Sequence, residues 1–239
     1  MRLLMIALLL PASAACQSKW EKDGTSIASS GSGATRSYAA SGFTGVDLRG
    51  SDDIDVKVGT NFAVTAEGDP KVLDQLEIQV VDGVLRVGRK NSDSWFDNDR
   101  GAQIHVVMPK LSMAGVRGSG NLTVERAEGD VSAVIAGSGN LVIADLRGGA
   151  TDLSVAGSGD LSASGTTTRL TASIAGSGDI NAGGLTASSA EVSVAGSGNV
   201  KGVVKGGAAV SIVGSGDVEL TGGAKCSISA VGSGEAHCS

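Results

Sequence analysis

Apolar and polar residues alternate along most of the second half of this chain, in short segments that meet at glycines. Before Gly176, the apolar Leu170, Ala172 and Ile174 are separated by Thr171 and Ser173. A period of two is typical of a β-strand that buries one face. The pattern therefore predicts a succession of strands, each with one side directed into a core.

A four-residue motif, Gly-Ser-Gly followed by Asn, Asp or Glu, divides these strands at regular intervals. It occurs seven times with steps of 18 to 20 residues, beginning at Gly118, Gly137, Gly157, Gly176, Gly196, Gly214 and Gly232. Each unit contains a strand, a sharp corner, a second strand and a return rich in Gly, Ser or Thr. Such an internal repeat indicates a solenoid or another stacked architecture.

One unit cannot bury its apolar face alone, but stacked units can. A meander of antiparallel hairpins and a β-helix both satisfy the pattern. The in-register motif and the Ala-rich inner faces favour the β-helix, because identical corners would then align. We therefore predict an all-β, single-stranded β-helix (β-solenoid) with about 19 residues per coil, regular over residues 118–239.

The first half carries weaker signals of the same kind. Residues Gly50 to Asp53 form a degraded copy of the motif, and Asp82-Gly83 between two alternating segments predicts a β-hairpin. We expect one β-helical domain over residues 37–239, with less regular coils at its N-terminal end.

The N-terminal residues 1–15 have the features of a signal peptide, with Arg2 before an apolar run and small residues before Cys16. Ordinary cleavage after Ala14 and lipidation of Cys16, as in a bacterial lipoprotein, are both compatible with this segment. Lipidation would leave an even number of cysteines. Residues 16–36 are polar and rich in Ser and Gly, so we expect a flexible tether that leads to an anchor in the outer membrane or a periplasmic location.

The composition restricts the core and the partners. Glycine accounts for 37 residues and aromatic residues for 3%, so a thin core of Val, Ile, Leu and Ala is expected. The formal charge is −6 and no basic stripe is present. An acidic surface repels the phosphate backbone, which argues against a nucleic-acid partner.

The first half also carries a resemblance to a known family. Phe43 to Val46, the strands around Asp82-Gly83, Ile104 to Pro109 and then Gly118-Ser119-Gly120 follow one another in a familiar order. Over residues 36–239 the chain resembles the bacterial putative auto-transporter adhesin, head GIN domain family. The resemblance implies a β-helical fold and an exported or surface-anchored location, and it brings no catalytic residues.

Two cysteines occupy equivalent places around the last corner. Cys226 lies six residues before Gly232 and Cys238 six residues after it, and both belong to the inward set. A disulfide between them would fasten the last coil, which has no following coil to cover it. Two buried free thiols are the alternative.

Two further features have a structural and a functional interpretation. The corner acids and amides could be turn residues or a cation-binding edge; they are Asn121, Asn140, Asp160, Asp179, Asn199, Asp217 and Glu235. We favour turn chemistry, because Asn and Asp tolerate tight corners. Trp95 and Phe96, in a polar loop, either plug the coil or contact a partner.

No catalytic, metal or cofactor site can be assembled from the sequence. The histidines His105 and His237 lack neighbours at metal-ligand spacing, and no triad is present. We expect a non-catalytic envelope protein that presents a rigid β-helix for adhesion or envelope interaction, with an envelope polymer, a glycan or a surface protein as partner. A carbohydrate-active enzyme and a purely structural or regulatory periplasmic module are the alternatives.

Overall fold

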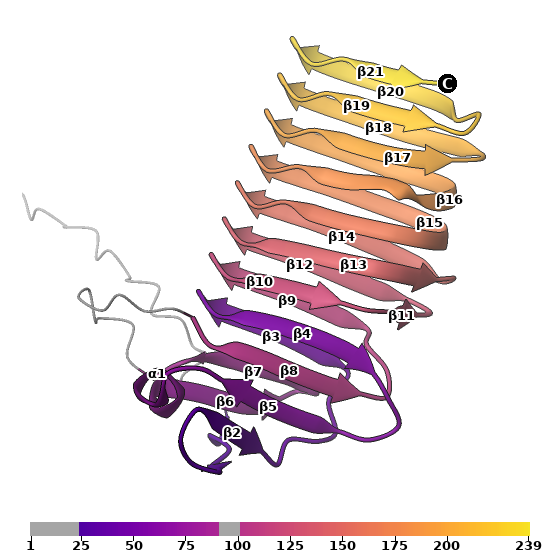
Figure 1. Ribbon diagram of the computed structural model, residues 1–239. Coiled ribbons are helices and arrows are strands. Elements are labelled where there is room, and N and C mark those ends of the chain that lie inside the picture. Colours follow the sequence, from indigo (N-terminus) through magenta and orange to yellow (C-terminus); the bar gives the residue numbers. More distant parts are fainter. Residues whose placement is uncertain (1–23, 91–100) are drawn as a thin grey trace, which may run out of the picture.

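The computed structural model describes residues 24–90 and 101–239. Figure 1 shows their arrangement: a stack of flattened coils rises from a base of mixed strands and one short helix. Each coil has two walls, one made of the strand before the corner and one made of the strand after it. The predicted β-helix is confirmed, and its coils follow the repeat of about 19 residues.

The walls are parallel sheets; the first keeps an unbroken register, and the second is interrupted by β-bulges or irregularities after Ile143, Ser162 and Ala182. The first wall contains β3 (Gly45–Gly50), β9 (Met113–Gly118), β12 (Val131–Gly137), β14 (Ala150–Gly157), β18 (Gly207–Gly214) and β20 (Lys225–Gly232). The second wall contains β4 (Asp53–Val58), β10 (Asn121–Val124), β13 (Asn140–Arg147), β17 (Val200–Val204), β19 (Val218–Thr221) and β21 (Ala236–Cys238). The short β11 (Ala127–Glu128) pairs with the end of β13.

Two long strands pass through the return bend and so belong to both walls. They are β15 (Leu161–Gly176) and β16 (Ile180–Gly196). Each contributes its first half to the second wall and its last half to the first wall, with a β-bulge in their pairing between Ser162 and Ser164. The bend therefore needs no separate turn in these coils.

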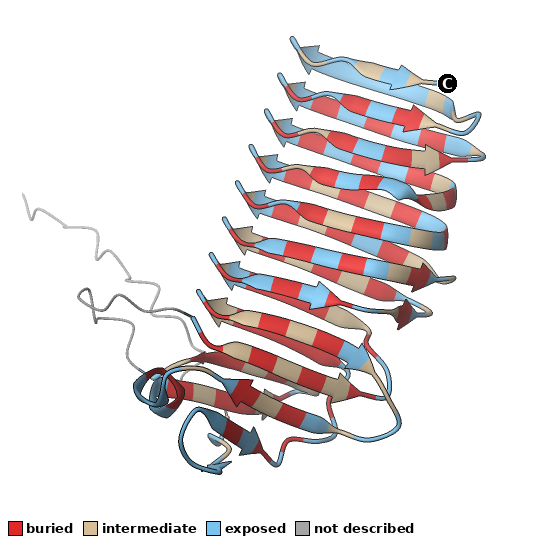
Figure 2. Ribbon diagram, viewed as in Figure 1, coloured by how far each residue is buried: buried red, intermediate tan, exposed pale blue. Residues whose placement is uncertain are grey.

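The core is a narrow column of aliphatic side chains between the walls. Figure 2 shows buried residues alternating with more exposed ones along the strands of the stack. Leu170, Ala172 and Ile174 of β15 are at most 1% exposed, as their period-two placement predicts. Burial of such side chains, at roughly 25 cal/mol per Å² of apolar surface, is the main stabilising contribution.

The corners align along one edge of the stack. In each repeat the first glycine has a φ between 124° and 145°, and the N–H of the following serine donates to the first-glycine carbonyl of the preceding coil, as Ser177 does to Gly157. Gly50 has the same conformation and pairs with Gly118. The degraded copy of the motif is therefore the first corner of the same row.

The base does not follow the order of the chain. The coil of β3 and β4 lies between the coil of β7 (Val84–Arg89) with β8 (Gln103–Met108) and the coil of β9 with β10, both of which come later in the chain. Antiparallel strands then close this end: β6 (Leu76–Val81) pairs with β7, and β5 (Ala63–Glu67) pairs with β8. Asp82 and Gly83, with φ of 51° and 75°, form the predicted hairpin turn.

The segment expected as a flexible tether is partly built into this base. Its strand β1 (Ser29–Ser30) pairs with β2 (Thr35–Tyr38), which in turn pairs antiparallel with β5. The helix α1 (Pro70–Gln75), capped by the Asp69 carboxylate, lies beside them and its Asp74 binds Arg36 at 2.8 Å. The prediction of a tether over residues 16–36 is therefore wrong for residues 24–36. These residues are polar, but their backbone pairs with neighbouring strands. Residues 16–23 lie outside the described part.

Candidate functional site

A shallow groove of about 700 Å³ runs over the last four coils on the outside of the second wall. Its floor is formed by the starts of β16, β17, β19 and β21. The groove is lined by two parallel columns of polar side chains, one at the corner position and one two residues later. The corner column consists of Asp179, Asn199, Asp217 and Glu235, and the second column of Asn181, Lys201, Glu219 and His237.

The corner column is a hydrogen-bonded ladder. The Asp179 carboxylate accepts from the backbone N–H of Asn199 at 2.7 Å, and the Asn199 side-chain oxygen accepts from the N–H of Asp217 at 3.0 Å. Asp217 repeats this contact with the N–H of Glu235 at 2.9 Å. One side-chain oxygen each of Asp179, Asn199 and Asp217 therefore accepts a backbone N–H of the next coil, and this explains why Asn and Asp recur at the corner.

The ladder begins in the base and follows the whole stack. Asp53 accepts from Asn121 through both its backbone and its side-chain nitrogen, at 2.9 and 2.8 Å. Asn121 accepts from the side chain of Asn140, and Asn140 from the backbone of Asp160. Among the described residues Asp82 is the only non-glycine residue with a positive φ, so the corner acids and amides do not adopt the left-handed conformation. Their side chains join successive coils. In residues 24–90 and 101–239, no three His, Cys, Asp or Glu side chains gather in a possible metal site.

The second column is solvent-exposed, and its side chains do not bond to the backbone of the next coil; the Asn181 side-chain oxygen accepts from Gly183 N–H of its own strand at 3.2 Å. Lys201 and Glu219 are neighbours on adjacent strands, with Nζ and Oε2 3.5 Å apart and side chains 62% and 53% exposed. An ion pair so exposed contributes about 0–1 kcal/mol to stability. These two charges are therefore available to a partner at little energetic cost.

The groove is acidic. Asp179, Asp217, Glu219 and Glu235 place four carboxylates on its lining, against the single ammonium of Lys201. Neighbouring strands lie about 4.8 Å apart, so successive charges of one column repeat at that spacing. The groove thus offers a regular row of hydrogen-bond acceptors to an extended partner.

Sequence reasoning identified the corner column but missed the second one. Asn181, Lys201 and Glu219 differ in chemistry, so they form no recurring letter in the repeat. The signal was positional, since each lies two residues after a corner Asn or Asp and faces outward by the period of two. Their shared surface becomes apparent only when coils are stacked.

Trp95, Phe96 and the lipidation candidate Cys16 lie outside the described residues. The structure does describe both stems of the segment that carries the two aromatic residues. The carboxylate of Asp52, which is fully buried, binds the Arg89 guanidinium at 2.7 and 3.1 Å and accepts from the Ala102 backbone N–H at 2.8 Å. One carboxylate therefore holds the last strand residue before the segment and the chain just after it.

The two histidines lie apart on the same wall. His105 lies on β8 with its Nδ1 3.6 Å from Oδ2 of Asp55 on β4, and both side chains are about two-fifths exposed. His237 lies on β21, beside Glu219 of β19. His105 thus stands in the base and His237 in the groove, so they do not form one site.

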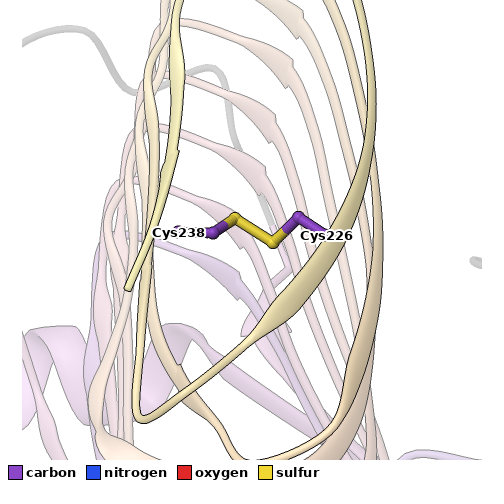
Figure 3. Close-up of a disulfide and its surroundings, with 2 residues drawn as sticks. All are labelled: Cys226 and Cys238. Carbon is purple, nitrogen blue, oxygen red and sulfur yellow. A yellow bond between two sulfur atoms is a disulfide. The ribbon is translucent and has the colours of Figure 1, made fainter.

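The predicted disulfide is confirmed. Figure 3 shows it spanning the interior of the last coil from Cys226 on β20 to Cys238 on β21. Their Cα atoms are 6.4 Å apart, within the range that a disulfide can bridge. The bond ties the two walls together at the end of the stack.

An apolar core between two parallel walls, built from coils that each contact only their neighbours, defines a β-solenoid. Within that class, the chain belongs to the family described as "Putative auto-transporter adhesin, head GIN domain", whose model matches residues 42–224. The resemblance found in the sequence is thereby confirmed. A search of curated proteins finds no match.

Solved structures share this fold over most of their length. A putative adhesin from Bacteroides fragilis NCTC 9343 is 22% identical with a TM-score of 0.81, covering 86% of this chain and 96% of its own. A putative lipid binding protein from Parabacteroides distasonis ATCC 8503 gives 22% and 0.64 with the same coverage. A putative adhesin from Parabacteroides merdae ATCC 43184 gives 19% and 0.63, covering 85% and 95%. At these identities the likeness establishes the fold.

Proposed function

We propose that this protein is a non-catalytic adhesin-like protein of the cell envelope that binds an extended polar partner in the groove of its second wall. The observation that carries the proposal is the pair of side-chain columns in register over four coils. A rigid, repeated array suits a repeated ligand, because each coil can make the same weak contact. An envelope glycan or an extended segment of a surface protein has this character.

The lining favours a partner that donates hydrogen bonds. Carboxylates accept hydrogen bonds only, and four of them lie along the groove. Hydroxyl groups of a sugar chain and amines of an amino sugar or a lysine side chain are suitable donors. The apolar residues of the lining, Ile180, Val200 and Val218, are buried in the core, so no large exposed apolar side chain lies in the groove to favour an acyl chain.

The alternative of a carbohydrate-active enzyme is less well supported by the same groove. A glycoside hydrolase needs one carboxyl group that donates a proton and one that acts as nucleophile or base. Here the ladder carboxylates of Asp179 and Asp217 already accept backbone hydrogen bonds, and the groove is open to water. These carboxylates serve the stacking of the coils.

The location is part of the proposal. We infer export through residues 1–15 and attachment through a lipid on Cys16, supported by the signal-like sequence and by the membership of an adhesin family. No helix of the described residues is long and apolar enough to cross a membrane. Intact-mass measurement of envelope-bound protein tests the anchor; a mature chain that begins at Ala15 with an unmodified Cys16 would contradict it.

The binding test compares matched substitutions on the two walls. Purified protein is applied to a glycan array and to isolated envelope polymers, first unaltered and then as Glu219→Arg. We expect the best ligand to bind on the order of tenfold more weakly to Glu219→Arg, a loss of about 1.4 kcal/mol. Glu191→Arg changes the same residue type on the outside of the first wall, in β16, and should bind normally.

Two outcomes would contradict the proposal. Equal binding by Glu219→Arg and the unaltered protein would exclude the groove as the site. Release of new reducing ends from a bound glycan, lost in the groove variant, would establish the enzyme instead.

A further inference from the structure

The last coil leaves one end of the stack open. Nearly every residue of β20 is exposed, and Ile228, which faces inward by its position, is 48% exposed. Figure 2 shows this coil without the buried positions that mark the coils below it. At the other end, β2, β5, β6 and α1 cover the base. Among the described residues, only the far end of the stack thus presents an uncovered core edge.

At this end of the stack, β20 has backbone N–H and C=O groups that a further strand could pair with. Lys225 N–H donates to the Gly206 carbonyl, so odd-numbered residues of β20 face β18. Cys226, Ile228 and Ala230 therefore direct their N–H and C=O groups away from the stack. Such a long, flat edge is a template for another strand unless something covers it.

The same alternation holds on the second wall. Glu235 accepts from Val218 N–H, and Ser239 N–H donates to Leu220, so odd-numbered residues of β21 face β19. Ala236 and Cys238 consequently direct their backbone groups outward, as the even-numbered residues of β20 do. In both walls, therefore, the even-numbered residues carry the outward-directed N–H and C=O groups at the open end.

A second copy of this coil fits both edges at once. A two-fold axis through Ile228 and Ala236 sets β20 antiparallel to the second copy's β20 and β21 antiparallel to its β21. Ile228 then faces its own counterpart and Cys226 faces the second copy's Ala230, so inward residues meet inward residues. The residues on the axis are also ones whose backbone groups are free, as a hydrogen-bonded antiparallel pair requires.

Hydrogen-bond complementarity supports the second copy over an unrelated strand. In the register centred on Ala236, the exposed Glu235 lies directly opposite the second copy's His237, and the symmetric contact repeats it. A carboxylate accepts a hydrogen bond from imidazole, and favourable cross-strand pairs contribute at this spacing. Neither residue has its side chain bound to another in the ladder, where Glu235 takes part through its backbone N–H.

We propose that two copies of this protein join end to end through β20 and β21, so that both walls continue across a two-fold axis. The contact is isologous and closes at two copies, because it consumes the open end of each. The two grooves meet at Glu235 and His237, which gives one binding surface of twice the length.

The first test measures mass in solution. The mature protein is examined by sedimentation equilibrium over a range of concentrations, and we expect a monomer–dimer equilibrium. Ile228→Pro removes an outward N–H while leaving the bonds to β18 intact, so it should weaken dimerisation by at least tenfold. Ile228→Val keeps the N–H and serves as the control.

The second test uses the charges and does not alter the backbone. Glu235→Lys should weaken the dimer by roughly tenfold, since it removes the carboxylate acceptor from both symmetric pairs. The double variant Glu235→Lys with His237→Glu places a carboxylate opposite each lysine and should recover the dimer. Glu191→Lys, the same change on the first wall, should leave the equilibrium unaltered. Circular dichroism confirms that each variant is folded.

A monomer at every concentration would overturn the inference, as would a dimer that Ile228→Pro and Glu235→Lys leave unchanged. Open-ended filaments would also overturn it, because they require a head-to-tail contact. The readout is independent of any ligand, so failure here would leave the proposed binding function standing, and loss of ligand binding would leave the dimer standing.

Discussion

The second glycine of each corner has no room for a side chain. A Cβ at Gly178 would collide with the carbonyl oxygen of Gly159 in the preceding coil and would lie 2.9 Å from Cγ1 of Val155. Gly207, at the start of β18, has nothing within 4 Å of the same position. The corner glycines are thus required by the close approach of stacked coils as well as by the turn itself.

We therefore predict that Gly178→Ala lowers the free energy of unfolding by about 3 kcal/mol, because two backbones must separate to admit the methyl group. Gly207→Ala is the matched control and should change the stability by less than about 0.5 kcal/mol. Urea denaturation measures both. Equal midpoints for the two variants would show that the coils are spaced more loosely than described.

Asp52 is the other residue whose environment dictates its identity. Removing its carboxylate in Asp52→Ala takes an ionic partner from Arg89 and an acceptor from Ala102 N–H, and breaking a buried pair costs about 3–5 kcal/mol. Thermal unfolding should register this loss, while Asp152→Ala, an exposed acid on β14, should melt normally. An unaltered melting temperature in Asp52→Ala would show that the clamp carries no stability.

The sequence predicted Asp52 as part of a corner but gave no sign of these partners. The corner glycine and the alternation around it are local, so they can be recognised without knowing the fold. Arg89 and Ala102 lie 37 and 50 residues further along the chain, and only the insertion of the β7 and β8 coil brings them to Asp52. Long-range contacts of this kind leave no periodic signal.

At the scale of elements, the last coil depends on its disulfide more than on burial. Ile228 and Val231 remain largely exposed, and Cys226 and Cys238 are only partly buried. The bond closes a loop with a sequence separation of 12 residues. It therefore takes the place of the covering that every earlier coil receives from its neighbour.

Replacing both cysteines by serine should lower the stability of the chain by roughly 3 kcal/mol in the loop-entropy model. Amide hydrogen exchange should show the loss concentrated in β20 and β21, which would fray from the stack. Reducing the unaltered protein with a thiol should reproduce the effect. Protection of β20 that survives both treatments would show that the last coil holds without the bond.

The regular strands were predictable because period-two burial and the corner motif agree in every repeat. The base was not, since alternation looks the same in parallel and antiparallel strands. Nothing in Ala63–Glu67 distinguishes β5, which pairs antiparallel with β8, from a further coil of the stack. The sequence predicted the residues of the groove's corner column. It did not predict Lys201 and Glu219 as lining residues, because they become neighbours only through the pairing of β17 with β19.

The molecule as a whole behaves as a one-dimensional stack, so a complete coil should be removable. Deleting residues 119–137 joins Gly118 to Ser138 and keeps the register of both walls. We expect a folded protein that retains its groove and whose urea m value is about a tenth smaller, because less surface is exposed on unfolding.

A deletion out of register is the control for that experiment. Removing residues 119–127 alone would place the return segment where a corner belongs. Residues that face inward would then face outward, so we expect no native-like circular dichroism spectrum. If the whole-coil deletion also failed to fold, the coils would be specific to their neighbours and the stack would not be modular.

The position of the β3–β4 coil has a consequence for the order in which the chain can acquire structure. These strands are made early, but their neighbours on both sides, Val84 and Met113 opposite Gly45, come much later in the chain. Closing the base therefore requires long loops and should be the slow step. Every later coil adds onto a finished edge through contacts about one repeat apart. If such a chain passes N-terminus first through an export channel, its base would fold while the C-terminal residues are still inside the channel. The later coils would then fold one after another, at the rate at which they leave the channel.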